Sequence, residues 1–144
     1  MTTQIRILLG SILLLTAAMA SAQNQRVSVK VPFSFVAGGQ SLPAGDYTIE
    51  LNRERNIVVL RSEDRFGQAR ATMARATMTE TSNKLTAAPD KSYAIFQCYG
   101  GHYFLAEIWR QGAGQVLNPG KLEQELARSS TKQEVRLAAQ LSPQ

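Results

Sequence analysis

Apolar and polar residues alternate along much of the chain with the period of two that is typical of β-strands. Between Arg26 and Phe35 the odd positions hold valine and phenylalanine, while the even positions hold Arg, Ser, Lys, Pro and Ser. This pattern predicts a strand with one buried and one solvated face. Pro32 has no backbone N–H to donate, so it predicts a sheet edge or a bulge at this point.

The alternation stops at Gly38-Gly39 and at the segment Leu-Pro-Ala-Gly of residues 42–45, and it then resumes with Tyr47. Proline at the second and glycine at the fourth position are typical of a type I β-turn. The stretch 31–50 is therefore predicted to form strand, turn and strand, with the turn setting the register. In that register the residues that share one buried face are Phe33, Phe35, Tyr47 and Ile49.

Two further strands are predicted in the middle of the chain. Residues 57–60 are apolar on both faces, which favours a central strand. Residues 69–78 contain the segment ARATM twice in tandem; a helix is the alternative here, since Ala and Met favour helices. The flanking turns favour a strand, and the polar residues 79–91 are predicted to form a loop.

A β-hairpin is predicted around Gly100-Gly101, because two strand-like segments, 93–99 and 102–109, flank these glycines and both central residues of a type I′ turn need a positive φ. With an unbroken register, Cys98 pairs with Tyr103. Glu107 then lies on the same face as Leu105 and Trp109. Both faces are largely apolar, so both sides of the hairpin are expected to be covered.

The C-terminal part combines a loop, a short helix and a last strand. Residues 111–120 contain three glycines and Asn-Pro and are predicted to form a loop, whereas 121–128 (KLEQELAR) fit two helical turns. Residues 132–141 alternate as a strand, with a helix capped by Thr131 and Glu134 as the alternative. The pattern as a whole predicts an all-β fold, an antiparallel sandwich or small barrel of about seven strands.

The first residues have the three parts of a secretory signal peptide: a positive start at Arg6, an apolar segment, and the small residues Ala20-Ser21-Ala22. We expect cleavage between Ala22 and Gln23, which divides the chain into a signal peptide (1–22) and one β domain (23–144). The apolar segment is shorter than the roughly 20 residues that a retained membrane span needs. The expected location is therefore the periplasm or the exterior, with no stable membrane span after cleavage.

The net charge and the cysteine content restrict the kinds of partner that such an exported domain is expected to bind. Removing residues 1–22 takes away only Arg6 and leaves 15 basic against 11 acidic residues, a net charge of +4. This mildly basic balance favours anionic polysaccharide or an envelope protein over nucleic acid. The single cysteine, Cys98, excludes an internal disulfide. A buried thiol is favoured over a disulfide-linked dimer.

The sequence gives little support for a catalytic site or a cofactor site. The only histidine, His102, and Cys98 lie on opposite faces of the predicted hairpin, which disfavours a nucleophile–base pair. Structural zinc needs four ligands of this kind and the chain has two candidates. No Gly-Lys-Ser/Thr follows Gly38-Gly39, so these glycines do not form a phosphate loop. We therefore predict no catalytic residue, no metal and no cofactor.

Two groups of side chains are candidates for a ligand or partner surface. The first belongs to the aromatic hairpin and comprises Tyr99, His102, Tyr103, Glu107 and Trp109. Aromatic rings of this kind either stack on sugars or pack in a core. The second is a patch of arginines, with Arg53 and Arg55 as its first candidates, because guanidinium groups bind phosphates and carboxylates. The other members of this patch are Arg61, Arg65, Arg70 and Arg75. The alternative for these arginines is an ordinary solvated surface.

The ordered set VPFSFVAGGQSLPAGDYTIE, CYGGHYFLAEIW and NPGKLEQELA resembles a family of small secreted bacterial proteins of unknown function. The resemblance covers most of the chain after the signal peptide, and it implies an all-β fold and export. It implies no catalytic residues. Our leading interpretation is a non-enzymatic structural or binding module of the cell envelope. The alternative is an envelope protein that binds or hydrolyses carbohydrate through residues 93–109 and Glu107.

Overall fold

The structure, a computed structural model, describes residues 25–52, 54–63, 69–80, 91–110 and 113–141. Several predicted features lie outside the described residues. These are the proposed signal peptide with its cleavage site between Ala22 and Gln23, the residues Arg53 and Arg65, and most of the predicted loop 79–91. The described residues form one sheet of ten strands and one short helix. The predicted all-β fold is confirmed.

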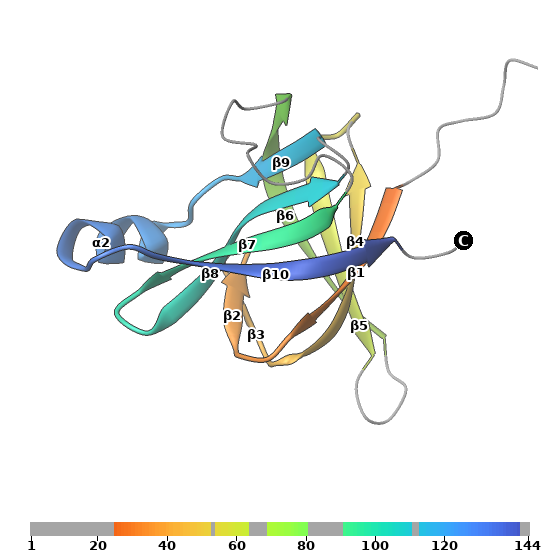
Figure 1. Cartoon of the computed structure of the whole chain (residues 1–144). Helices are drawn as coiled ribbons and strands as arrows, with labels where there is room; N and C mark the ends of the chain where they lie inside the picture. Colours follow the sequence, from red (N-terminus) through yellow and green to blue (C-terminus); the bar gives the residue numbers. More distant parts are fainter. Residues whose placement is uncertain (1–24, 53, 64–68, 81–90, 111–112, 142–144) are drawn as a thin grey trace, which may run out of the picture.

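Figure 1 shows the strands and the helix of the structure. Most of the strands lie where the alternation of apolar and polar residues predicts them. Their bounds are β1 (Gln25–Val31), β2 (Phe35–Ala37), β3 (Gln40–Leu42), β4 (Gly45–Asn52), β5 (Ile57–Glu63), β6 (Ala69–Glu80), β7 (Ser92–Tyr99), β8 (His102–Arg110), β9 (Ala113–Leu117), α2 (Lys121–Ser129) and β10 (Gln133–Leu141).

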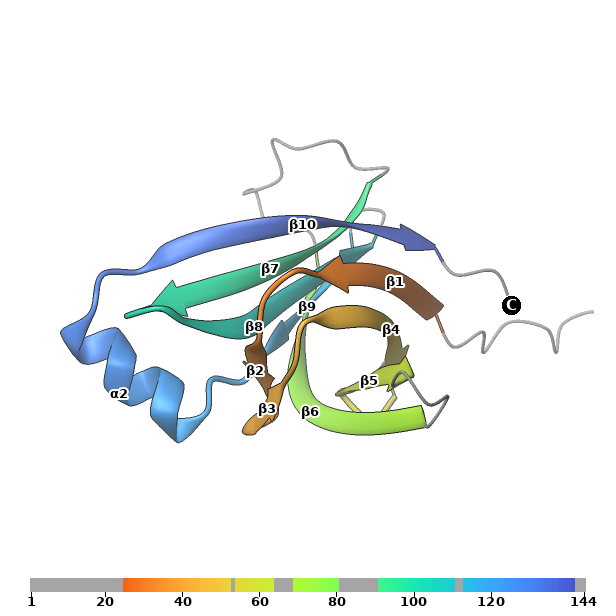
Figure 2. The same ribbon diagram turned by 90° about the horizontal axis from the view of Figure 1, so that it is seen from below.

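The sheet curls into a nearly closed barrel. Its strand order is β3-β2-β8-β7-β10-β1-β4-β5-β6-β9, and β9 also pairs with β8, which brings the sheet back on itself. Figure 2 shows β7, β8 and β10 on one side of the barrel and β4, β5 and β6 on the other. All pairings are antiparallel except that between β2 and β8. Curling and closure reduce the number of exposed strand edges.

The strand count exceeds the prediction because the predicted strand 26–35 is divided into β1 and β2, and because β3 and β9 lie in segments predicted to be a turn and a loop. Gly38 and Gly39, with φ of 57° and 80°, form the tight turn of a separate β2–β3 hairpin. Pro32 lies between β1 and β2 rather than in an edge strand, so it ends β1. The segment 111–120, predicted to be a loop, contains β9, and the three glycines of this segment hide the alternation.

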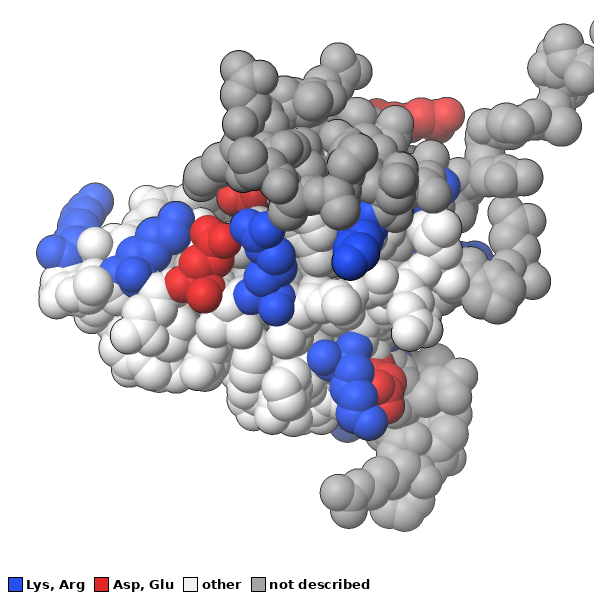
Figure 3. All heavy atoms as spheres, viewed as in Figure 1, with Lys and Arg blue, Asp and Glu red and all other residues white. Residues whose placement is uncertain are grey.

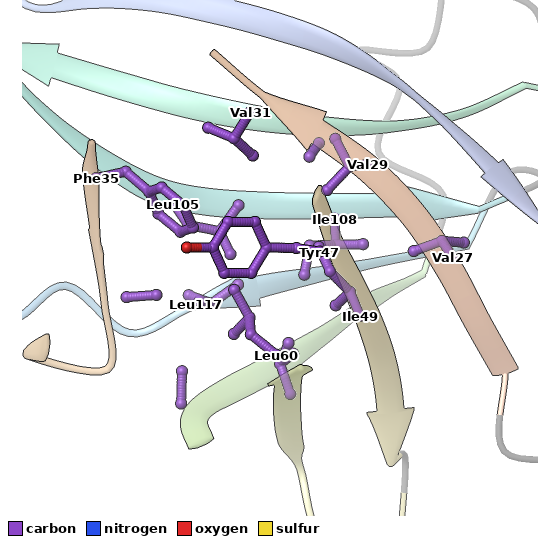
Figure 4. Close-up of a cluster of buried hydrophobic side chains, with 14 of the residues drawn as sticks. Val27, Val29, Val31, Phe35, Tyr47, Ile49, Leu60, Leu105, Ile108 and Leu117 are labelled. Carbon is purple, nitrogen blue, oxygen red and sulfur yellow. The ribbon is translucent and has the colours of Figure 1, made fainter. Parts of the chain in front are cut away.

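The barrel interior is filled by the inward residues of these strands (Figure 4). The most enclosed of them include Val27, Ile49, Val58, Leu60, Phe96 and Ile108, each at most 2% exposed. Phe35 and Tyr47, predicted to share a face, meet edge to face at 5.1 Å between ring centroids. Phe33 packs against the same cluster. The period-two prediction for residues 31–50 is thus confirmed at the level of the core.

The β7–β8 hairpin has the predicted glycine turn but a changed register. Gly100 and Gly101 have φ of 57° and 85°, and Cys98 pairs with Tyr103 as predicted. Further on, Ile95 pairs with Glu107 and Phe96 with Leu105, so Ala106 forms a β-bulge. The bulge exchanges the two faces beyond it. Glu107 and Trp109 therefore lie on the outer face, whereas Leu105 points into the core, and the predicted shared face was wrong.

Three shorter or ambiguous segments have the secondary structure that their sequences favour. Residues 69–80 and 133–141 are strands rather than helices, and α2 covers the predicted helical segment. The helix, however, buries Glu123 and leaves Leu122 about half exposed (48%). It lies outside one end of the barrel, beside the β7–β8 turn (Figure 1). Among the described residues no helix has the length and apolar character needed to cross a membrane.

Candidate functional site

A groove of about 1130 Å³ lies on the outer face of β10, β1, β4 and β5. Its charged and polar lining consists of Arg26, Ser28, Lys30, Asp46, Thr48, Arg61, Ser62 and Gln140. Since binding sites in proteins are concave surfaces with converging polar groups, this groove is the candidate site. On the side of the molecule shown in Figure 3, basic and acidic side chains are interspersed over the described surface.

The period of two brings the cationic residues of the groove onto one face. Arg26 and Lys30 occupy the outward positions of β1, opposite Glu50 and Asp46 of β4. Arg61 of β5 pairs with Thr48 in the same layer. Directly opposed side chains on one face lie about 5 Å apart at their Cβ atoms. The register therefore gathers charges that are 35 residues apart in the sequence, from Arg26 to Arg61.

Glu50 lies between the two arginines and holds them together. Its Oε2 atom is 3.7 Å from Nε of Arg26 and 3.5 Å from Nε of Arg61. The Glu50 side chain is only 11% exposed, whereas those of Arg26 and Arg61 are 48% and 55% exposed. Oε2 makes no hydrogen bond within the protein. The nearly buried carboxylate thus neutralises part of the positive charge of the two arginines. Both guanidinium groups remain accessible to a ligand.

Of the predicted arginine patch, Arg61 lines the groove, whereas Arg55 lies elsewhere. Arg55 is exposed in the turn between β4 and β5, where its backbone N–H donates to Oδ1 of Asn52 at 2.9 Å. It does not line the groove, and Arg53 is outside the described residues. Sequence reasoning missed Arg26 and Lys30. Their signal was present, because they are the charged outward positions of the first predicted strand.

Trp109 and Glu107 of the aromatic hairpin belong to a packed cluster on the outer face. Trp109 is 4% exposed, and its Nε1–H donates to Oε2 of Glu107 at 2.8 Å. Its ring stacks on Tyr93 at 6.3 Å between centroids, and the Arg136 guanidinium lies 4.9 Å from the Tyr93 centroid. Burial raises the pKa of Tyr93, while Arg136 opposes that rise. Both hairpin residues are thus engaged in contacts within the protein.

The remaining hairpin candidates are separated from one another. Tyr99 is buried and donates its hydroxyl to Oε1 of Gln97 at 2.8 Å. Tyr103 stacks on Phe33 at 4.0 Å between centroids. His102 is exposed beside the turn, while Cys98 is buried with a free thiol. The register, which pairs Cys98 with Tyr103 and Tyr99 with His102, does not bring the thiol and the imidazole together.

Within the described ranges no group of three or more His, Cys, Asp or Glu side chains is placed to hold a metal ion. In comparisons with protein-family models, with curated proteins and with solved structures, nothing matches this chain.

Proposed function

We propose that this chain is an exported, non-enzymatic binding module of the bacterial cell envelope, and that its ligand is an anionic polysaccharide held in the groove of β10, β1, β4 and β5. The observation that carries the proposal is the pair Arg26 and Arg61, positioned by the nearly buried Glu50 and open to solvent. Lys30 adds a third cation to the same lining. Export is supported by the pattern of residues 1–22.

The chemistry of the groove suits a polymer that carries both carboxylates and hydroxyls. Guanidinium groups form charge-assisted hydrogen bonds to carboxylates, and the arginine fork adds geometric specificity. The neutral lining residues Thr48 and Gln140 are hydrogen-bonding partners for sugar hydroxyls. The groove is open rather than enclosed, so it can admit part of a longer chain.

The binding test uses polygalacturonate as the anionic probe and dextran as the neutral one. We expect saturable binding of polygalacturonate that weakens as salt is raised through physiological ionic strength, since salt screens exposed charges. Lys30→Gln is the first variant because it leaves both partners of Glu50 in place. It should weaken binding about tenfold, equivalent to about 1.4 kcal/mol.

Arg128→Gln is the matched control, because it removes the same charge from the exposed last turn of α2, outside the groove. It should leave the affinity unchanged. Equal losses in Lys30→Gln and Arg128→Gln would mean that only net charge matters and would contradict a defined site. Equal affinity for dextran would contradict recognition of carboxylates, and it would favour the alternative of carbohydrate binding through residues 93–109.

Export is tested separately, by mass spectrometry of the protein recovered from the periplasm and the medium. Cleavage between Ala22 and Gln23 gives a mature chain that starts at Gln23. A cell-associated chain that retains Met1 would contradict both the export and the envelope location. The binding result does not depend on this outcome, so the two parts of the proposal can fail independently.

A further inference from the structure

A second crevice, of about 610 Å³, lies where the barrel is incompletely closed. It is bounded by the β2–β3 hairpin, by β6, and by the connection from β9 to α2. It shares no lining residue with the basic groove. The two sites are therefore separate, and the inference below does not rest on the proposed function.

The strand arrangement explains why the opening exists. β9 covers only the far part of β8, pairing with residues from Glu107 onward, whereas β2 pairs with Tyr103 and Phe104. The hairpin tip approaches β6 so closely that a Cβ on Gly38 would lie 2.4 Å from the carbonyl oxygen of Met73. The hairpin thus fills part of the gap between β8 and β6. The remaining space forms the crevice.

The floor of the crevice belongs to the hydrophobic core. Phe104, Leu105 and Leu117 line it and are 2%, 3% and 6% exposed. The rim carries Met73 and Leu122, which are 68% and 48% exposed. Among the described residues only three large hydrophobic side chains are exposed, and these are two of them; Leu141 is the third. Exposed apolar surface that gathers around a concave site is typical of ligand binding.

Two cations lie on the same rim. Arg75 follows Met73 by two residues in β6, so both side chains are on one face of the strand. Lys121 directly precedes Leu122. Within the described part of the chain, no ion pair joins Arg75 or Lys121 to a carboxylate. The acidic lining residue, Glu123, is 9% exposed and accepts a hydrogen bond from the backbone of Gly120.

We propose that this crevice binds a single-chain anionic amphiphile, with its alkyl chain along Met73, Leu122 and the core floor and its carboxylate at Arg75 and Lys121. The exposed side chains of Met73 and Leu122 favour a ligand with an alkyl chain over a fully hydrated anion, because burying their apolar surface drives association. The two cations favour an acidic headgroup over a neutral one. The volume lies within the range of small-molecule sites, roughly 300–1,000 Å³.

The test is isothermal titration of the mature protein with decanoate, at concentrations where decanoate is monomeric, and with decanol as the neutral probe. We expect one decanoate per chain. Leu122→Gln should weaken binding about tenfold, whereas Leu141→Gln should leave it unchanged. Leu141 is the matched control, since it has the same 48% exposure and does not line the crevice. Arg75→Gln should weaken decanoate binding and leave decanol binding unaffected.

Several outcomes would overturn the proposal. These are the absence of saturable decanoate binding, equal losses in Leu122→Gln and Leu141→Gln, or an unchanged affinity in both Leu122→Gln and Met73→Thr. Protein that forms dimers in sedimentation experiments until Leu122→Gln makes it monomeric would assign the crevice to a second copy of the chain instead. Lys30→Gln should leave decanoate binding unchanged, so that failure of the basic groove and failure of this crevice remain distinguishable.

Discussion

The hydroxyl of Tyr47 donates a hydrogen bond of 2.6 Å to the backbone carbonyl of Pro43, four residues earlier. This bond spans the connection between β3 and β4. It resembles the tyrosine corners of β-sandwiches, in which a tyrosine hydroxyl bonds back to the preceding backbone. Burial raises the pKa of Tyr47, while the Ser62 hydrogen bond and the charge of Arg70 oppose that rise. A tyrosine hydroxyl is protonated and able to donate at neutral pH. The Leu-Pro-Ala-Gly-Asp-Tyr segment therefore contains both the bend between β3 and β4 and the side chain that fixes it.

Tyr47→Phe removes the hydroxyl, with its bonds to the Pro43 carbonyl and to the Ser62 side chain, while keeping the ring that packs against Phe35. The carbonyl of Pro43 then loses its partner, and we expect the free energy of unfolding to fall by about 1 kcal/mol. Urea denaturation followed by circular dichroism measures this change. Tyr103→Phe is the control, because its ring stacks on Phe33 and the stacking needs no hydroxyl. A loss in Tyr103→Phe as large as that in Tyr47→Phe would contradict a specific role for the Tyr47–Pro43 bond.

The alternation of apolar and polar residues was enough to predict most strands of the barrel. Each strand buries one face, and the apolar positions of the alternation indicate which face is buried. The alternation succeeded even for residues 69–80, whose Ala and Met content favours a helix, and for 133–141. It failed at β9, where glycines conceal the pattern. It failed also at Ala106, since a bulge is set by the fit of β8 between β7 and β9 and leaves no mark in β8 itself.

The candidate groove could not be predicted from the sequence, for a different reason. Arg26 and Lys30 were visible as outward residues of the first strand, but their proximity to Arg61 depends on the order β1-β4-β5. That order is a tertiary property. The interpretation of Glu107 and Trp109 depended on the register of β8, and the single bulge moved both to the outer face. A one-residue change in register exchanges every side chain beyond it between the two faces.

Gly114 of β9 is sterically constrained by the indole of Trp109. It lies directly opposite Trp109, and a Cβ at this position would be 2.7 Å from Cδ2 of the indole. Gly114→Ala forces the ring to move and breaks its packing on Tyr93, so we expect a loss of about 1–3 kcal/mol in stability. Trp109 is the only tryptophan of the chain. Its emission spectrum therefore reports the displacement directly.

Gly45→Ala is the comparison for Gly114→Ala, because its Cβ would make an ordinary contact of 3.7 Å with Cε2 of Tyr47. It should leave the tryptophan emission unchanged and alter stability by less than about 0.5 kcal/mol. An unshifted emission maximum in a folded Gly114→Ala protein would contradict the close approach of Gly114 to the indole.

The β7–β8 turn tests backbone strain without a steric clash. Gly101 has a φ of 85°, and no atom lies within 4 Å of the position that a Cβ would occupy. Gly101→Val should lower the free energy of unfolding by about 1–3 kcal/mol, because β-branched residues are strained at positive φ. Gly101→Asn should lower it clearly less, since asparagine tolerates this region better. Equal melting temperatures for the two variants would contradict an origin in the backbone conformation.

Glu123 gives the fold a dependence on pH with a defined sign. Burial raises its pKa, and the backbone hydrogen bond from Gly120 and the nearby Lys132 oppose the rise. Its charge in turn raises the pKa of Tyr99 of β7, beyond the effect of burial on that phenol. Because the folded protein holds the Glu123 proton more tightly than the unfolded chain, this residue favours folding below about pH 4.3, the unfolded pKa. That contribution is lost as the pH rises through the folded pKa.

Glu123→Gln should remove this dependence, since the amide does not titrate and its oxygen can still accept the bond from Gly120. The stability of the variant relative to the natural protein should therefore increase from pH 4 to pH 7. Thermal unfolding across this range measures the difference. Glu125→Gln on the same helix is the control, because Glu125 is exposed, and its difference from the natural protein should change far less with pH. A Glu123→Gln difference that is constant with pH would mean that Glu123 is equally free to ionise in the folded and unfolded chains.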